Sequence, residues 1–151
     1  MRTRRATLAD VDFMAGQPAR DFCAMTSPGV DIYDATRVRA LLTMLVEMHF
    51  VVLAETPSGE IAGGLGALVH PHVWNPALRC ATECFWWVDQ GYRGSRAAHS
   101  LLRAYSDFIE REGIVKGALC LLEGSPVSDR VISRMGFAPR EHTYIKEMAH
   151  A

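Results

Sequence analysis

Long hydrophobic runs are absent from this sequence. No apolar segment approaches the roughly 20 residues that a membrane-spanning helix requires. The basic start, residues 1–5, is not followed by the apolar stretch of a secretion signal, and Asp10 and Asp12 come too early for an organelle transit peptide. We therefore expect a cytoplasmic protein with no membrane partner.

Closely paired cysteines are also missing. The chain has four cysteines, at positions 23, 80, 84 and 120, and none of them forms a C-x-x-C pair. Zinc sites and redox motifs depend on such pairs, and disulfide frameworks belong to oxidising compartments. His70 and His72 flank a proline but have no third ligand beside them. The sequence therefore predicts free thiols and no metal site.

An excess of charge of either sign is lacking as well. The formal net charge is -1, so no overall field attracts a polyanion. Small arginine clusters at residues 2–5 and 37–39 are more typical of a solvated face, and we do not expect nucleic-acid binding. No G-x-x-x-x-G-K-[ST] motif and no early G-x-G-x-x-G motif indicates a nucleotide-binding domain. With 151 residues and no repeat or linker, residues 1–151 are expected to form a single domain.

Hydrophobic periodicity predicts a mixture of strands and helices. Strands are expected at residues 1–7, 50–55, 61–70, 79–88, 114–122 and 140–148, with a loop at 71–78. Helices are expected from residue 8, after an N-cap at Asp34, at 94–113 and at 126–135. This order predicts an α+β fold, an α/β/α sandwich. Its central sheet would have six to seven mostly antiparallel strands, with helices on both faces.

The turn after the apolar strand that ends at Val88 is the most informative segment. It reads V-D-Q-G-Y-R-G-S-R-A-A and leads into a helical pattern. A strand, a glycine turn and a helix start together direct free amides and the helix dipole toward an anion. Arg93 and Arg96 add charged donors at the same place. The pattern predicts a ligand that carries phosphate groups.

The same residues resemble the GNAT superfamily of N-acyltransferases, and the element order matches over nearly the whole chain. Residues 93–98 are similar to the Q/R-x-x-G-x-G/A loop that holds the coenzyme pyrophosphate, and Met135-Gly136-Phe137 is similar to the G-F that ends the penultimate helix. The loop departs from the pattern because Arg96 takes the place of a glycine. In this change the chain resembles phage-encoded members of the superfamily.

The resemblance implies a fold of the GNAT type and acetyl-CoA as the acyl donor. The implied coenzyme-binding residues are Trp87 and Val88 through their backbones, Arg93, Gly94, Ser95, Arg96, Ala97 and Ala98 in the loop, and Ser125 in place of a usual asparagine. The acceptor would be a primary amine of a small molecule or peptide, attacking the thioester directly. A homodimer that pairs through the last strand is compatible with the resemblance.

The chemistry calls for a base that deprotonates the amine and a partner for the leaving thiolate. Glu83 is the candidate base, because period-two counting places it with Phe85 and Trp87, where burial would raise its pKa. Residues 70, 72 and 142 are histidine alternatives. Ile132 stands where the family often has a tyrosine, so Tyr144 is the candidate acid, with Ser125 as the alternative.

These departures leave a second hypothesis open. A GNAT-type module could bind acyl-CoA, or serve as an interaction domain, while catalysing little. Ile132 and Arg96 favour that alternative, and substitution of Glu83 would separate it from an active enzyme.

Overall fold

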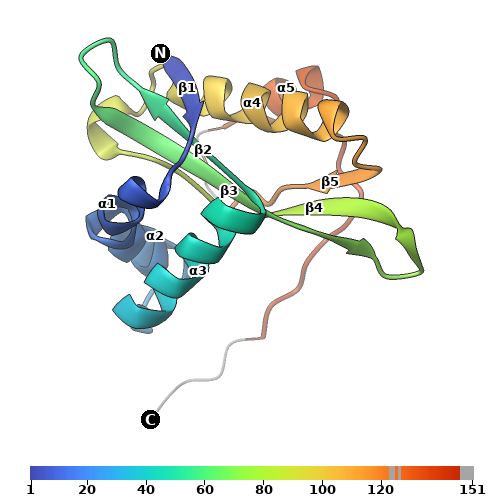
Figure 1. Cartoon of the computed structure of the whole chain (residues 1–151), viewed down its shortest axis with the longest axis horizontal. Coiled ribbons are helices and arrows are strands. Elements are labelled where there is room, and N and C mark those ends of the chain that lie inside the picture. Colours follow the sequence, from blue (N-terminus) through green and yellow to red (C-terminus); the bar gives the residue numbers. More distant parts are fainter. Residues whose placement is uncertain (123–124, 126, 147–151) are drawn as a thin grey trace.

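The computed structural model describes residues 1–122, 125 and 127–146, and its centre is one mixed sheet. The strands are β1 (Arg2–Arg5), β2 (Phe50–Glu55), β3 (Ile61–His72), β4 (Asn75–Val88) and β5 (Lys116–Ala118), and they lie side by side in chain order (Figure 1). The first four pair antiparallel, whereas β4 and β5 are parallel. The crossover between the parallel strands is the helix that follows β4, as parallel pairing requires.

Helices cover both faces of the sheet (Figure 1). One face carries η1 (Leu8–Asp10), α1 (Val11–Ala15), α2 (Gln17–Thr26) and α3 (Ala35–Met48), and the other carries α4 (Ala97–Arg111) and α5 (Asp129–Arg134). Each face has its own apolar core, with Leu101, Tyr105 and Phe108 under α4 and with Met14 and Leu45 under the first group. The predicted α+β sandwich is confirmed.

The predicted six to seven strands are wrong for the part of the chain that the structure describes, which holds five. The strand predicted at 114–122 is confined to Lys116–Ala118. Residues 140–146 of the last predicted strand have no regular structure, and 147–148 lie outside the described residues. In Figure 1 this segment runs past β5 and away from the body of the protein, so it has no neighbouring strand to satisfy a ladder.

The predicted loop at 71–78 is also wrong. β3 and β4 continue as one long hairpin, and His72 pairs with Asn75 at its end. Antiparallel partners satisfy the backbone groups there, which outweighs the loop signal of the two prolines at 71 and 76. The hairpin tip projects beyond the helices, and Trp74 on it is 89% exposed.

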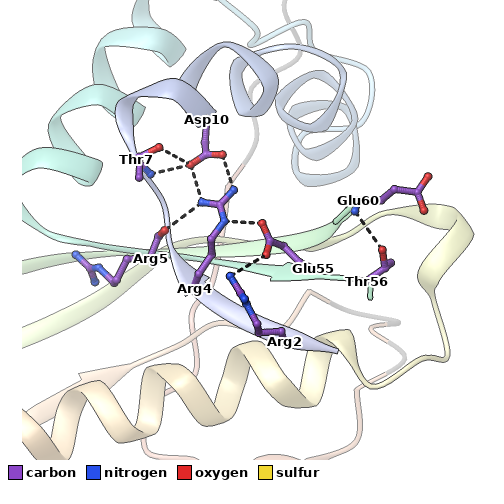
Figure 2. A network of polar contacts seen from close by, with 8 residues as sticks. All are labelled: Arg2, Arg4, Arg5, Thr7, Asp10, Glu55, Thr56 and Glu60. Carbon is purple, nitrogen blue, oxygen red and sulfur yellow. Dashed lines mark hydrogen bonds and ion pairs between the residues drawn. The ribbon is translucent and has the colours of Figure 1, made fainter. Parts of the chain in front are cut away.

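A polar network fastens β1 to the helices that follow it (Figure 2). The Arg4 guanidinium donates to both carboxylate oxygens of Asp10, at 2.8 Å each, and through Nε to Glu55 on β2. Asp10 also accepts from the backbone N–H and hydroxyl of Thr7, at 2.7 and 2.9 Å. Asp10 is 8% exposed, and the hydrogen bonds from Arg4 lower its pKa to about 2. The network thus holds a buried carboxylate in its charged form.

Candidate functional site

The parallel strands β4 and β5 form a fork. Their pairing ends at Thr82 opposite Ala118, whereas β4 continues for six more residues, to Val88. Continued register would place Glu83 opposite Leu119, but no described residue pairs with β4 on this side beyond Thr82. The main-chain groups of β4 from the fork to Val88 therefore form a free edge that an extended ligand could join.

A β-bulge at Cys84 decides which way Glu83 faces. β3 places Gly66 opposite Phe85 and Ala67 opposite Glu83, so Cys84 is the extra residue of β4. Phe85 packs in the core under α1 and α3, whereas the Glu83 carboxylate accepts from the Cys120 N–H at 3.1 Å, across the fork. The expectation from period-two counting, that Glu83 lies with Phe85 and Trp87, is therefore wrong.

The environment of Glu83 suits a base. Its side chain is partly buried, and this burial raises the pKa of the carboxyl above its ordinary value, although the hydrogen bond from the Cys120 N–H opposes the rise. A carboxylate with a raised pKa accepts a proton more readily near neutral pH. Glu83 thus combines a position in the fork with a favourable basicity.

The loop after β4 presents free backbone amides. Gly94 has a φ of +80°, a conformation that favours glycine, and it turns the chain toward α4. The first hydrogen bond of α4 runs from Ser100 N–H to Arg96 O, and Ala97 N–H donates to the Ser95 hydroxyl at 3.2 Å. The N–H groups of residues 98 and 99 find no acceptor in the described part of the chain. Their arrangement at a helix start is that of an anion site.

Two positively charged residues precede these amides in the same loop. Arg93 and Arg96 are exposed, and neither forms an ion pair with a described residue. Because the Arg96 side chain lies at the surface, it does not fill the core behind the loop. The fork, the free edge of β4 and this loop follow one another directly along the chain.

A family model described as the acetyltransferase (GNAT) family matches residues 21–137. The chain belongs to the GNAT acetyltransferase family. The family resemblance stated from the sequence is confirmed, while the similarity to phage-encoded members stays a prediction. No curated protein sequence matches the chain.

Solved acetyltransferase structures share this fold at low sequence identity. Ribosomal-protein-alanine N-acetyltransferase from Brucella melitensis is 15% identical, with a TM-score of 0.68 and coverage of 98% of this chain and 100% of that one. Glucosamine-6-phosphate N-acetyltransferase from Arabidopsis thaliana is 12% identical, with a TM-score of 0.69 and 98% coverage of both chains. An aminoglycoside acetyltransferase from an uncultured soil sample is 13% identical, with a TM-score of 0.71, covering 99% of this chain and 96% of that one. The TM-scores and the coverage show a shared fold, whereas identities this low leave the acceptor open.

The coenzyme positions expected on β4 of this GNAT chain lie at its far end. Trp87 packs toward α1, with its ring 6.5 Å from that of Phe13, whereas Val88 packs on the α4 side. Both are paired with β3 on one side only. Gly63 lies opposite Val88, and a Cβ at that glycine would stand 2.6 Å from Trp87 O, so the close approach of β3 requires glycine here.

The structure does not gather the remaining predicted residues at the fork. Tyr144 is 94% exposed on the irregular C-terminal segment and forms no hydrogen bond with Glu83 or another described residue, and its role as acid stays a prediction. Ser125 lies shortly before α5; its N–H donates to Leu122 O and its hydroxyl accepts from Val127 N–H. Ile132 is buried in the core.

Two further side chains lie near the fork, one named from the sequence only as an alternative base and one not assigned to the site at all. The alternative base, His70, hydrogen-bonds at 3.0 Å to the hydroxyl of Thr82, the last residue of β4 that pairs with β5. Tyr105 on α4 reaches both strands of the fork with its hydroxyl. Helical spacing predicts that Tyr105 faces the core, but nothing in the sequence indicates where its hydroxyl ends.

Among the described residues, no cluster of three or more histidine, cysteine, aspartate or glutamate side chains could hold a metal ion. All cysteines are free thiols, at positions 23, 80, 84 and 120. No helix in the described ranges is long and apolar enough to cross a membrane.

Proposed function

We propose that this GNAT protein transfers an acetyl group from acetyl-CoA to a primary amine. The observation that carries the proposal is the fork, because β4 leaves β5 at Thr82 and then runs directly into the amide-rich loop before α4. An extended acyl donor with phosphates at one end and a thioester at the other matches a free strand edge that lies between an anion site and a carboxylate. The family membership supports acyl transfer in general.

Each part of the site has a role in binding. The pyrophosphate would lie against the loop of residues 94–98 and the free N–H groups of residues 98 and 99 at the start of α4, with Arg93 and Arg96 as charged donors. The pantetheine amides would pair with the free edge of β4 at Trp87 and Val88. Ser125, shortly before α5, would contact the same ligand. These assignments follow the GNAT pattern onto this chain's own residues.

Glu83 would accept the proton that the amine gives up as its nitrogen attacks the thioester carbon. The new C–N bond forms, the C–S bond breaks, and the electron pair leaves on the thiolate. Because a free thiol has a pKa of ~8.5, the thiolate can depart without a dedicated acid, and it takes its proton from solvent or from Tyr144. The carboxylate faces the fork, where the thioester would lie.

Calorimetric titration tests the binding part of the proposal. We expect acetyl-CoA and free CoA to bind and ATP not to bind, because the β4 edge recognises the pantetheine arm that ATP lacks. Arg93→Ala should weaken acetyl-CoA binding about tenfold, which corresponds to the ~1.4 kcal/mol of one charge-assisted hydrogen bond. Arg103→Ala is the matched control, because Arg103 is exposed on α4 beyond the loop.

Absence of binding to both CoA species would contradict the proposed donor. Equal losses in the two arginine variants would show that the effect comes from general charge rather than from the loop. Unchanged affinity in Arg93→Ala would remove Arg93 from the site.

A coenzyme-binding module with little catalysis is the second candidate function. It is favoured by the buried Ile132 and the exposed Tyr144, which leave no described tyrosine at the position of the usual acid. Such a module would bind acetyl-CoA but release no CoA in the presence of amines. We also propose a cytoplasmic location, a small-molecule or peptide amine as the acceptor, and a homodimer.

A further inference from the structure

The Tyr105 hydroxyl lies at the base of the fork. Its oxygen is 3.1 Å from Ala81 O on β4 and 3.0 Å from Ala118 O, the carbonyl of the last residue of β5. The side chain is fully buried, at 0% exposure. Burial raises the pKa of the phenol, so the hydroxyl stays protonated and acts as a donor to these carbonyls. One buried donor therefore bridges both strands where their pairing stops.

A second side chain bridges the strands just beyond this point. Cys120 N–H donates to the Glu83 carboxylate instead of to a β4 carbonyl. On an extended strand, residues 118 and 120 direct their backbone groups to the same side, so both Ala118 O and Cys120 N–H face β4. In a continued ladder, β4 backbone groups would satisfy them. Here the Tyr105 hydroxyl and the Glu83 carboxylate serve as their partners.

The Ala118 carbonyl and the Cys120 N–H therefore both have a hydrogen-bond partner, although β4 and β5 do not pair at the opening of the fork. The half-buried Ala118 carbonyl would be costly without a partner, and this cost would otherwise drive the two strands to pair further or to rearrange, whereas the exposed Cys120 carries less of it. Because Tyr105 is anchored in α4, the helix that follows the amide-rich loop, its hydroxyl also ties the fork to the helix that would hold the phosphates.

We propose that Tyr105 is a positioning residue that fixes the separation of β4 and β5 and thereby sets the affinity for acyl-CoA. This inference rests on the proposed function, since it assigns the opened edge of β4 to the pantetheine arm. Tyr105 does not touch the reacting atoms. It acts through the backbone of Ala81 and Ala118, and it keeps the Cys120 N–H within reach of Glu83.

The ring and the hydroxyl of Tyr105 can be separated by experiment. The Tyr105 ring stacks on the Phe137 ring, with 6.0 Å between the ring centroids, and lies tilted beside the Phe50 ring, with 5.8 Å between the centroids. Tyr105→Phe keeps both of these aromatic pairs. Ser106→Ala is the matched control, because it also deletes a hydroxyl on α4, one that donates to Met135 O at 3.3 Å and not to either strand of the fork.

Two measurements on the full chain test the inference. The first is the position of the Cys120 amide in a proton–nitrogen correlation spectrum of the ligand-free protein. The second is the Kd for acetyl-CoA by calorimetry, well below the thermal midpoint of each variant. We expect Tyr105→Phe to move the Cys120 amide proton upfield, as its bond to Glu83 weakens, and to raise the Kd about tenfold. Ser106→Ala should change neither.

An unmoved Cys120 amide with an unchanged Kd in Tyr105→Phe would overturn the inference. It would also be overturned if Ser106→Ala reproduced both changes, because a general loosening of α4 would then explain them. If the unsubstituted chain did not bind acetyl-CoA, the proposed function would fail, while the Cys120 amide would still decide whether Tyr105 holds the fork.

Discussion

Glu83→Gln is expected to lower kcat for amine acetylation by about 100- to 10,000-fold while the Kd for acetyl-CoA changes little. The rate falls because an amide cannot accept the proton that the attacking amine gives up, and loss of general-base catalysis costs about this much. Affinity is retained because glutamine has the same length, and its side-chain oxygen can still accept from the Cys120 N–H. Steady-state release of CoA, with calorimetry alongside, measures both quantities.

The pH dependence makes the test more specific. Burial raises the pKa of Glu83, so the acidic limb of kcat/KM should lie above the ordinary glutamate value of ~4.3. The sign follows from the role, since a base works only when deprotonated and the rate must rise with pH through the raised pKa. In Glu83→Gln this limb should disappear. A rate profile recorded from about pH 5 to 9 would show it.

Glu112→Gln is the matched control, because Glu112 is an exposed carboxylate at the far end of α4 and pairs with Arg79. It should leave both kcat and the acidic limb unchanged. An unaffected rate in Glu83→Gln would rule out Glu83 as the base. His70, which hydrogen-bonds to Thr82 beside the fork, would then be the next residue to substitute. If the unsubstituted chain binds acetyl-CoA but acetylates no amine, the module without catalysis is the better description.

Local patterns in the sequence predict those parts of the site that depend on neighbouring residues. The helix N-cap at Asp34 accepts from Arg37 N–H, as the sequence indicates. The turn at Gly94 needs a positive φ, and the helix start that follows it leaves amides free. The amide-rich loop could therefore be predicted from residues 88–102 alone. These features need no knowledge of distant partners.

The fork is different, because its geometry depends on contacts between segments far apart in the chain. The bulge at Cys84 arises from the register of β4 against β3, and it reverses the face on which Glu83 lies. Strict alternation along a strand cannot anticipate one extra residue. The Tyr105 hydroxyl hydrogen-bonds to Ala81 O, which lies 24 residues earlier in the sequence. Hydrophobic periodicity describes only neighbouring residues and cannot predict such a contact.

The last predicted strand failed for a related reason. Residues 140–146 have an alternating pattern, but a strand exists only where a neighbour satisfies its backbone. In the described part of the chain no strand flanks β5 on its outer side, and the Lys116–Glu141 ion pair, 2.9 Å long, is an exposed contact that adds little. The alternating pattern of these residues therefore indicates that they could form a strand, but it does not indicate whether a neighbouring strand is present.

The second large effect is expected in stability, from Asp10→Ala. At pH 7 the substitution should lower the free energy of unfolding by about 3 kcal/mol, at the lower end for a buried ion pair, because Arg4 keeps Glu55 as a partner. Part of the loss comes from Thr7, whose N–H and hydroxyl both donate to this carboxylate. Asp12→Ala is the matched control, because Asp12 is 78% exposed in its ion pair with Arg39 and should cost less than about 1 kcal/mol. Urea unfolding of the three proteins measures the difference.

Acid should reduce the stabilisation that Asp10 provides over a defined pH range. The carboxyl has a pKa of about 2 in the folded chain and an ordinary value of 3.8, so below 3.8 the unfolded chain binds the proton first. The stability gap between the unsubstituted chain and Asp10→Ala should therefore be full above about pH 5 and shrink between about pH 4 and 2. A gap that does not narrow on acidification would assign the loss to packing instead of charge. Because β1 lies at the opposite edge of the sheet from β5, Asp10→Ala should leave the Kd for acetyl-CoA of the folded fraction unchanged, which separates the stability of the fold from the working of the fork.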